Sequence, residues 1–115
     1  MLPNRMQLRQ QTEEQLKRLK SFTGITPNVA ARIAFFRSIE SGLRYTGDQR
    51  KLDGNLVLDK ITWLGDTVQV TELLLQLTYP DLDQKEMMKA WAFHVEDGIA
   101  ALRNHKNLHD FSQAI

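Results

Sequence analysis

The sequence predicts a mainly α-helical protein, a compact bundle of about four helices with a short N-terminal segment of extended character. Three observations favour this fold class. Apolar residues recur at three- and four-residue steps in separate segments. Glycine or proline stands between these segments. The chain of 115 residues is long enough for one domain with a modest core. We therefore expect a single helical domain over residues 1–115.

The N-terminal segment alternates between polar and apolar residues. Arg5, Gln7 and Arg9 are separated by Met6 and Leu8, which is the period-two pattern of a half-buried strand. Because only five residues follow the pattern, an extended conformation is one option for this segment.

The first helix is predicted from Thr12 to the stop at Gly24. Thr12 and Gln15 stand three residues apart, which is the spacing of a capping box. Its apolar side is formed by Leu16, Leu19 and Phe22.

The second helix is predicted from Thr26 to about Ser41, with Gly42 as its end. Thr26 is a good N-cap, and Pro27 suits the first helical position because its missing amide hydrogen costs nothing there. Apolar residues surround most of this helix: Val29, Ala30, Ile33, Ala34, Phe35, Phe36 and Ile39. One small protomer offers little cover for such a helix, so the sequence predicts self-association.

Residues 44–60 contain glycine, asparagine and several acids, and this composition predicts a loop or a small hairpin around Asp53–Asn55. The segment "ITWLGD" then carries an apolar anchor into a turn. A third helix is expected after it, capped by Asp66 with Gln69 and halted by Pro80.

A fourth, long helix is expected after Asp81 or Asp83, either of which can cap it. Its apolar residues repeat at helical spacing: Met87, Met88, Trp91, Val95, Ile99 and Leu102. Gly98 lies inside this helix and weakens it, which indicates a close approach of another helix at that point. The tail after His105 is expected to fray.

Charge is divided unevenly along the chain. Residues 1–51 carry ten lysines and arginines against four acids, whereas residues 52–115 carry five against ten. Such asymmetry is typical of a protein whose one end meets a polyanion. The alternative is that the two halves mix in space and the charges only solvate the surface.

The densest basic cluster lies on the first helix and consists of Lys17, Arg18 and Lys20. Glu13 with Lys17 and Glu14 with Arg18 are spaced as i,i+4 pairs, so these two cations can also serve only to support the helix. Lys20 has no such partner along the helix and is the best candidate for an external phosphate.

Catalytic and metal-binding patterns are thin. There is no cysteine, which excludes disulfides, thiolate zinc sites and cysteine-held clusters within this chain. His94 is expected to be a hydrogen-bonded packing residue, and Trp63 and Trp91 are expected to lie in the core. His105 and His109, with Asp110, are a weak metal pattern because no distant third ligand accompanies them. We expect no enzyme activity, no cofactor and no metal.

No apolar run is long enough to span a membrane, and no signal-peptide pattern opens the chain, so a cytoplasmic location is expected.

A strand, a basic helix, a glycine turn and a Thr-Pro-capped helix together resemble the ribbon-helix-helix repressors, whose paired strands enter the major groove. On that likeness Arg5, Gln7 and Arg9 would read bases, because they share one strand face. About 65 further residues, with two more helices, have no role in such a repressor.

A closer resemblance covers the chain nearly end to end. The stretch "LPNRMQLRQQTEEQLKRLKSFTGITPNVAARIAFFRSIESG", with the later "ITWLGD" and "HVEDGIAAL", resembles the DndE family of the bacterial system that replaces a non-bridging phosphate oxygen of DNA with sulfur. The resemblance implies a helical homo-oligomer, with a tetramer as one arrangement, that binds duplex DNA and prefers nicked duplex. It also implies partners: a cysteine desulfurase and iron-sulfur proteins.

Together these observations predict a non-catalytic DNA-binding accessory subunit that displays Lys17, Arg18 and Lys20, helped by Arg5 and Arg9, to phosphates. The first alternative is a sequence-specific repressor of the ribbon-helix-helix type. The second is a scaffold that assembles sulfur enzymes through its acidic half.

Overall fold

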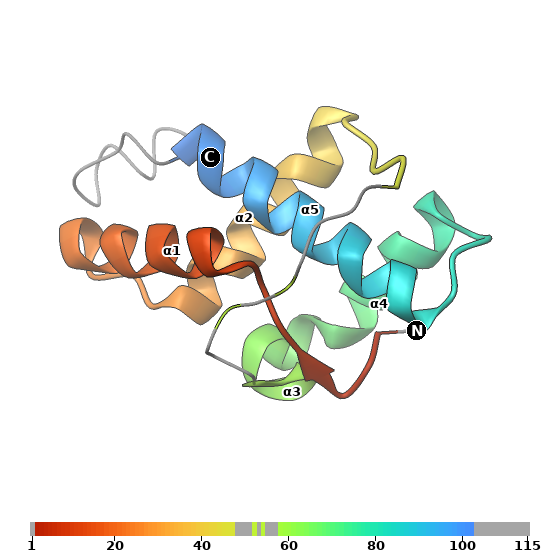
Figure 1. Ribbon diagram of the computed structural model, residues 1–115, viewed down its shortest axis with the longest axis horizontal. Coiled ribbons are helices and arrows are strands. Elements are labelled where there is room, and N and C mark those ends of the chain that lie inside the picture. Colours follow the sequence, from red (N-terminus) through yellow and green to blue (C-terminus); the bar gives the residue numbers. More distant parts are fainter. Residues whose placement is uncertain (1, 48–51, 53, 55–57, 103–115) are drawn as a thin grey trace.

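The computed structural model describes residues 2–47, 52, 54 and 58–102 of the chain (Figure 1). The elements follow in the order β1 (Arg5–Met6), α1 (Gln10–Thr23), α2 (Pro27–Ser41), β2 (Leu58–Asp59), α3 (Lys60–Leu64), the 3-10 turn η1 (Gly65–Thr67), α4 (Val68–Thr78) and α5 (Gln84–Leu102). The predicted mainly α fold with four principal helices and a short N-terminal strand is confirmed, and α3 adds one short helix to it.

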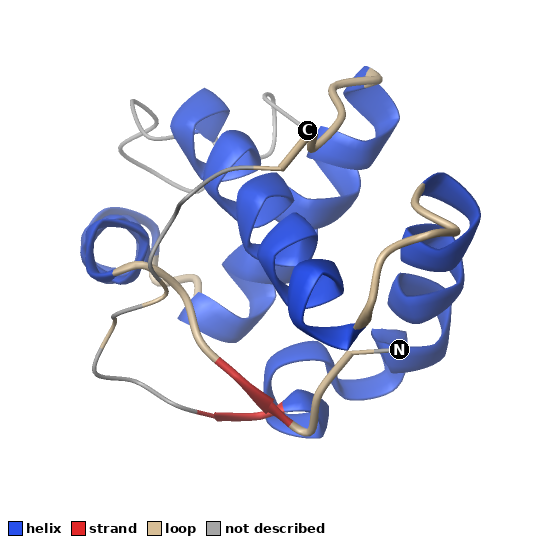
Figure 2. Cartoon of the chain, turned by 45° about the vertical axis from the view of Figure 1, so that its right-hand side comes forward, coloured by secondary structure: helices blue, strands red, loops and turns tan. Residues whose placement is uncertain are grey.

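α2 and α5 form the central helix pair, and α1 packs against both of them (Figure 2). Gly98 of α5 lies against the backbone of Ala34 in α2, so closely that a methyl group added at Gly98 would overlap the carbonyl of Ala34. The close approach predicted at Gly98 is therefore confirmed. Small residues on the facing side of α2, namely Ala30, Ala31 and Ala34, are fully buried and permit this contact.

The aromatic core joins α3 to this pair. Trp63 and Trp91 are 1% and 0% exposed, and their rings meet edge to face with centroids 6.1 Å apart. Their predicted core positions are thus confirmed. Phe35 of α2 is also completely buried.

The N-terminal strand pairs within the chain. β1 runs antiparallel to β2, with Arg5 opposite Asp59 and Met6 opposite Leu58. Met6 and Leu8 are buried while Arg5 is exposed, as the alternating pattern predicts. The hairpin predicted around Asp53–Asn55 lies largely outside the described residues. Gly54 is described, and its amide donates to the carbonyl of Leu8.

Helix ends set by glycine and proline agree with the sequence. Gly24 and Gly42 close α1 and α2 in the left-handed conformation, with φ of 77° and 87°. Thr26 and Pro27 begin α2 as predicted. α4 stops at Thr78, two residues before the proline, and the Asp83 carboxylate accepts the Glu86 amide at the start of α5.

The two predicted capping boxes are wrong. α1 begins at Gln10 with Arg9 as its N-cap, so Thr12 lies inside the helix, where its hydroxyl approaches Glu96 of α5 at 3.5 Å. At the third predicted helix, Asp66 lies in η1, and Thr67 is the N-cap of α4. In both places a tertiary contact or an extra turn shifts the start away from the local pattern.

The cover of α2 also differs from the prediction. Of its apolar residues Val29 alone is exposed, at 39%, and the others are buried or partly buried by the rest of the protomer. The premise that one protomer leaves this helix uncovered is therefore wrong. Among the described helices, the row of exposed apolar residues lies on α4 instead. No helix in the described part of the chain combines the length and apolar character needed to cross a membrane.

Candidate nucleic-acid interface

The three residues of the basic cluster on the first helix are all exposed. Leu16 and Leu19 face the core, at 1% and 4% exposure. Lys17, Arg18 and Lys20 are all exposed on the second half of α1. The amphipathic helix thus gathers three predicted site residues within about one turn.

The three cations differ in their intramolecular partners. Lys17 donates to Glu13 over 3.1 Å, and the Glu13 side chain is nearly buried while Lys17 is 64% exposed. Within the described part of the chain, Arg18 and Lys20 form no ion pair or hydrogen bond through their side chains. The predicted pair of Glu14 with Arg18 is therefore not formed. Of the three cations of this cluster, Arg18 and Lys20 are thus available to an external anion.

The two N-terminal arginines lie elsewhere. Arg9 pairs with Glu96 of α5 and is partly buried, so its guanidinium fastens α1 to α5. Arg5 is exposed on β1, beyond the N-terminal end of α1 (Figure 1). Lys17, Arg18 and Lys20 are all exposed within about one turn of α1, whereas Arg5 and Arg9 lie apart from them.

The predicted base-reading face is largely occupied by contacts within the chain. Gln7 donates through Nε2 to the carbonyl of Gly54 at 2.7 Å, and Arg9 is held by Glu96. One edge of β1 is also paired with β2. These contacts weigh against a ribbon formed by two copies of this strand.

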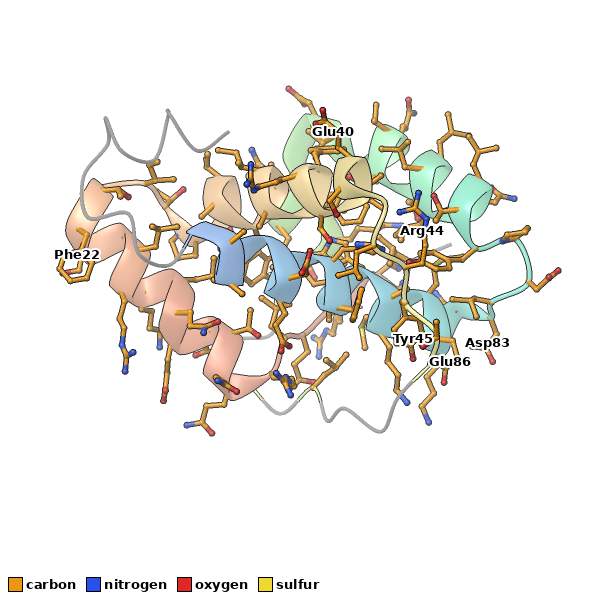
Figure 3. All side chains as sticks on the ribbon, turned by 90° about the horizontal axis from the view of Figure 1, so that it is seen from above. Phe22, Glu40, Arg44, Tyr45, Asp83 and Glu86 are labelled. Carbon is orange, nitrogen blue, oxygen red and sulfur yellow. The ribbon has the colours of Figure 1, made fainter. Side chains whose placement is uncertain are left out.

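An exposed aromatic side chain accompanies the basic cluster. Sequence periodicity placed Phe22 in the apolar stripe of the first helix, but its side chain is 53% exposed and projects at the far end of α1 (Figure 3). The helix ends one residue later at Thr23, before the core can cover this position. In the sequence, the only sign that Phe22 accompanies the basic cluster is its position two residues after Lys20.

The buried histidine belongs to a hydrogen-bonded chain that sequence reasoning did not find. The Tyr79 hydroxyl accepts from the Tyr45 amide and meets His94 Nε2 at 2.6 Å. His94 Nδ1 lies 2.7 Å from Ser38 Oγ, which donates to Asp97 at 2.8 Å. Because a carboxylate only accepts and Ser38 has one proton, Nδ1 carries the hydrogen of His94 and Tyr79 donates to Nε2.

Electrostatics keep this histidine neutral. Burial lowers the pKa of His94 to about 4, the charge of Arg44 acts in the same direction, and Asp97 opposes them. Burial also raises the pKa of Tyr79, which favours its role as a donor. The predicted packing role of His94 is confirmed.

No cluster of potential metal ligands occurs among the described residues. The weak pattern of His105, His109 and Asp110 lies outside them.

The chain was compared with known proteins. No curated protein sequence matches it. The profile of the family described as DNA sulphur modification protein DndE matches residues 5–110.

Solved structures agree with this match. The crystal structure of DndE from Escherichia coli B7A, involved in DNA phosphorothioation modification, is 69% identical with a TM-score of 0.87. The match covers 89% of this chain and 100% of that one. A DndE mutant with two glycines replaced by lysine, also involved in DNA phosphorothioation, is 67% identical with a TM-score of 0.83, covering 88% and 98%. This chain therefore belongs to the DndE family of DNA sulphur modification proteins.

Proposed function

We propose that this protein is a non-catalytic DNA-binding subunit of the DNA phosphorothioation system, acting as a homo-oligomer that holds duplex DNA for the sulfur-transfer enzymes. The observation that carries the proposal is the exposed cluster on α1, where Arg18 and Lys20 have no partner among the described residues. Membership of the family supplies the pathway.

The amino-acid composition separates the role of this subunit from that of the enzymes that handle sulfur. A chain whose 115 residues include no cysteine has no thiolate with which to carry a persulfide or ligate a cluster. In this proposal a cysteine desulfurase and iron-sulfur proteins handle the sulfur, and this subunit supplies affinity for DNA.

The lysine and arginine side chains on α1 would contact DNA phosphates, and phosphate contacts depend little on base sequence. Each phosphate that is neutralised releases counterions, so the logarithm of the binding constant falls with the logarithm of salt by about 0.9 per contact. With three cations on α1, each protomer should contribute a slope of at most about −3.

The exposure of Phe22 supports a preference of this protein for nicked over intact duplex DNA. At a nick the backbone is interrupted and a base pair can expose its face, on which an aromatic ring can stack for about 1–3 kcal/mol. An exposed Phe22 beside the basic cluster is suitably placed for such a contact.

The test is a titration of the protein with intact, nicked and single-stranded DNA of unrelated sequences at several salt concentrations. The double variant Arg18→Glu/Lys20→Glu should lose most affinity for all three, and Phe22→Ala should lose chiefly the advantage of nicked over intact duplex. Lys17 is left unchanged because a glutamate there would face Glu13.

Lys85→Glu is a single-site control for reversal of charge at an exposed lysine, since Lys85 is also exposed but lies at the start of α5. If the folded double variant binds as tightly as the parent, the proposed surface is wrong. A parent that binds no DNA would favour the scaffold. A palindromic site bound at least about a thousandfold above random duplex would favour the repressor.

A further inference from the structure

The C-terminal parts of α2 and α5 enclose a cleft of about 730 Å³. This volume lies in the range of sites that bind small molecules or single side chains. Its described lining comes from α2, from α5 and from Leu43, and not from α1. The cleft is therefore separate from the basic cluster. Ser38 and Gly98 are its buried lining residues.

The serine hydroxyls of the cleft have no proton to offer a ligand. Ser38 Oγ donates to Asp97 Oδ2 at 2.8 Å, and Ser41 Oγ donates to the Ser38 carbonyl at 2.6 Å. A hydroxyl has one hydrogen and two acceptor positions. A ligand therefore meets both serine side chains as acceptors only.

The carboxylates of the cleft are acceptors as well. Asp97 is partly buried and forms no ion pair within the described part of the chain. Its Oδ2 accepts from Ser38, which leaves Oδ1 open. Glu40, an exposed lining residue, adds a second negative charge. The cation in the described lining, Arg37, already has an interaction of its own. The unused polar groups thus call for a positively charged donor.

Apolar side chains form much of the remaining wall, among them Ile33, Phe36 and Ala101. They suit an aliphatic stem. Phe36 is only partly buried, and the face of an aromatic ring also attracts a cation. A guanidinium fits best on a carboxylate with both oxygens open, whereas Asp97 already uses one. An ammonium, with three separate donors, suits acceptors that come from different side chains.

We propose that the α2–α5 cleft, defined by Phe36, Ser38, Asp97 and Ala101, binds a primary alkylammonium group. The ammonium head pairs with Asp97, and the alkyl stem lies against the apolar wall. A free polyamine and the lysine side chain of a protein partner share this chemistry, so the test compares them. The inference goes beyond DNA binding and does not depend on it.

The test is calorimetric titration of the parent, at physiological salt, with spermidine, with an end-blocked Ala-Lys-Ala peptide and with pentan-1-ol as an uncharged probe. At least one amine should bind, and pentanol should bind at least about tenfold more weakly, because it has no charge to place on Asp97. Tighter binding of spermidine would identify a free polyamine as the ligand, and tighter binding of the peptide would identify a lysine of a partner.

Two variants locate the site. Asp97→Asn should lower the affinity for the amine at least about tenfold, and should keep the fold because its amide oxygen can still accept from Ser38. Ala101→Phe fills the cleft from an exposed position without changing charge, and should also weaken binding. Asp66→Asn is the matched control, since Asp66 is an exposed carboxylate in η1, and it should bind like the parent.

A parent that binds none of the amines would overturn the proposal, as would folded Asp97→Asn and Ala101→Phe proteins that bind them like the parent. Arg18→Glu/Lys20→Glu should bind the amine normally, and Asp97→Asn should bind DNA normally. Failure of the cleft and failure of the proposed function can therefore be told apart.

Discussion

His94 occupies the middle of a hydrogen-bonded chain that has one direction. From the Tyr45 amide to the Asp97 carboxylate, each group donates to the next. Protonating His94 would turn Nε2 into a donor facing the Tyr79 hydroxyl, and would place a charge in a site that is 0% exposed. This series of hydrogen bonds therefore requires a neutral His94 imidazole.

This requirement predicts sensitivity to acid. The pKa of His94 is about 4 in the folded protein against 6.5 for an ordinary histidine, so the unfolded chain takes up the proton first. The contribution of neutral His94 to the free energy of unfolding is fully present above pH 6.5. It is lost as the pH falls toward 4, by about 3 kcal/mol in total. Urea unfolding at several pH values should show this loss in the parent and much less of it in His94→Gln. Equal pH dependence in both proteins would contradict the assignment.

Gly98 of α5 lies so close to α2 that a larger residue would clash there. Gly98→Ala would add a methyl group against the carbonyl of Ala34. The central helix pair would have to separate, at a cost of at least about 2 kcal/mol beyond any gain in helix propensity. Ala100→Ser, which adds one heavy atom at an exposed position of the same helix, should cost less than about 1 kcal/mol. Denaturant unfolding compares the two, and similar stabilities would show that the helices do not meet as closely as described.

At the scale of single elements, the predictable features were those controlled by a few neighbouring residues. Gly24, Gly42, Thr26 with Pro27, and Pro80 set helix ends through backbone geometry that acts locally. The capping box at Asp66 failed because this residue lies in the turn η1, before α4 begins. The one at Thr12 failed because its hydroxyl approaches Glu96 of α5. Such partners come from elsewhere in the fold and leave no trace in local spacing.

The members of the basic cluster on α1 should not contribute equally to DNA binding. Lys17 must leave Glu13 to reach a phosphate, whereas Arg18 and Lys20 have no described partner to leave. Lys20→Ala and Arg18→Ala should each reduce the salt slope of DNA binding by about 0.9. Lys17→Ala should reduce it by clearly less. Salt titrations of the three single variants decide this, and equal reductions would show that the pair with Glu13 opens at no cost.

At the scale of the whole molecule, long-range pairings determine what the ends of the chain do. β1 joins β2, Arg9 joins Glu96, and the Leu2 amide joins Glu72. The sequence located the basic helix and the buried centre because amphipathic spacing reports which side faces the core. It did not reveal that α2 would be covered within the protomer and α4 left exposed. That outcome depends on how helices are arranged, which spacing within one helix does not specify.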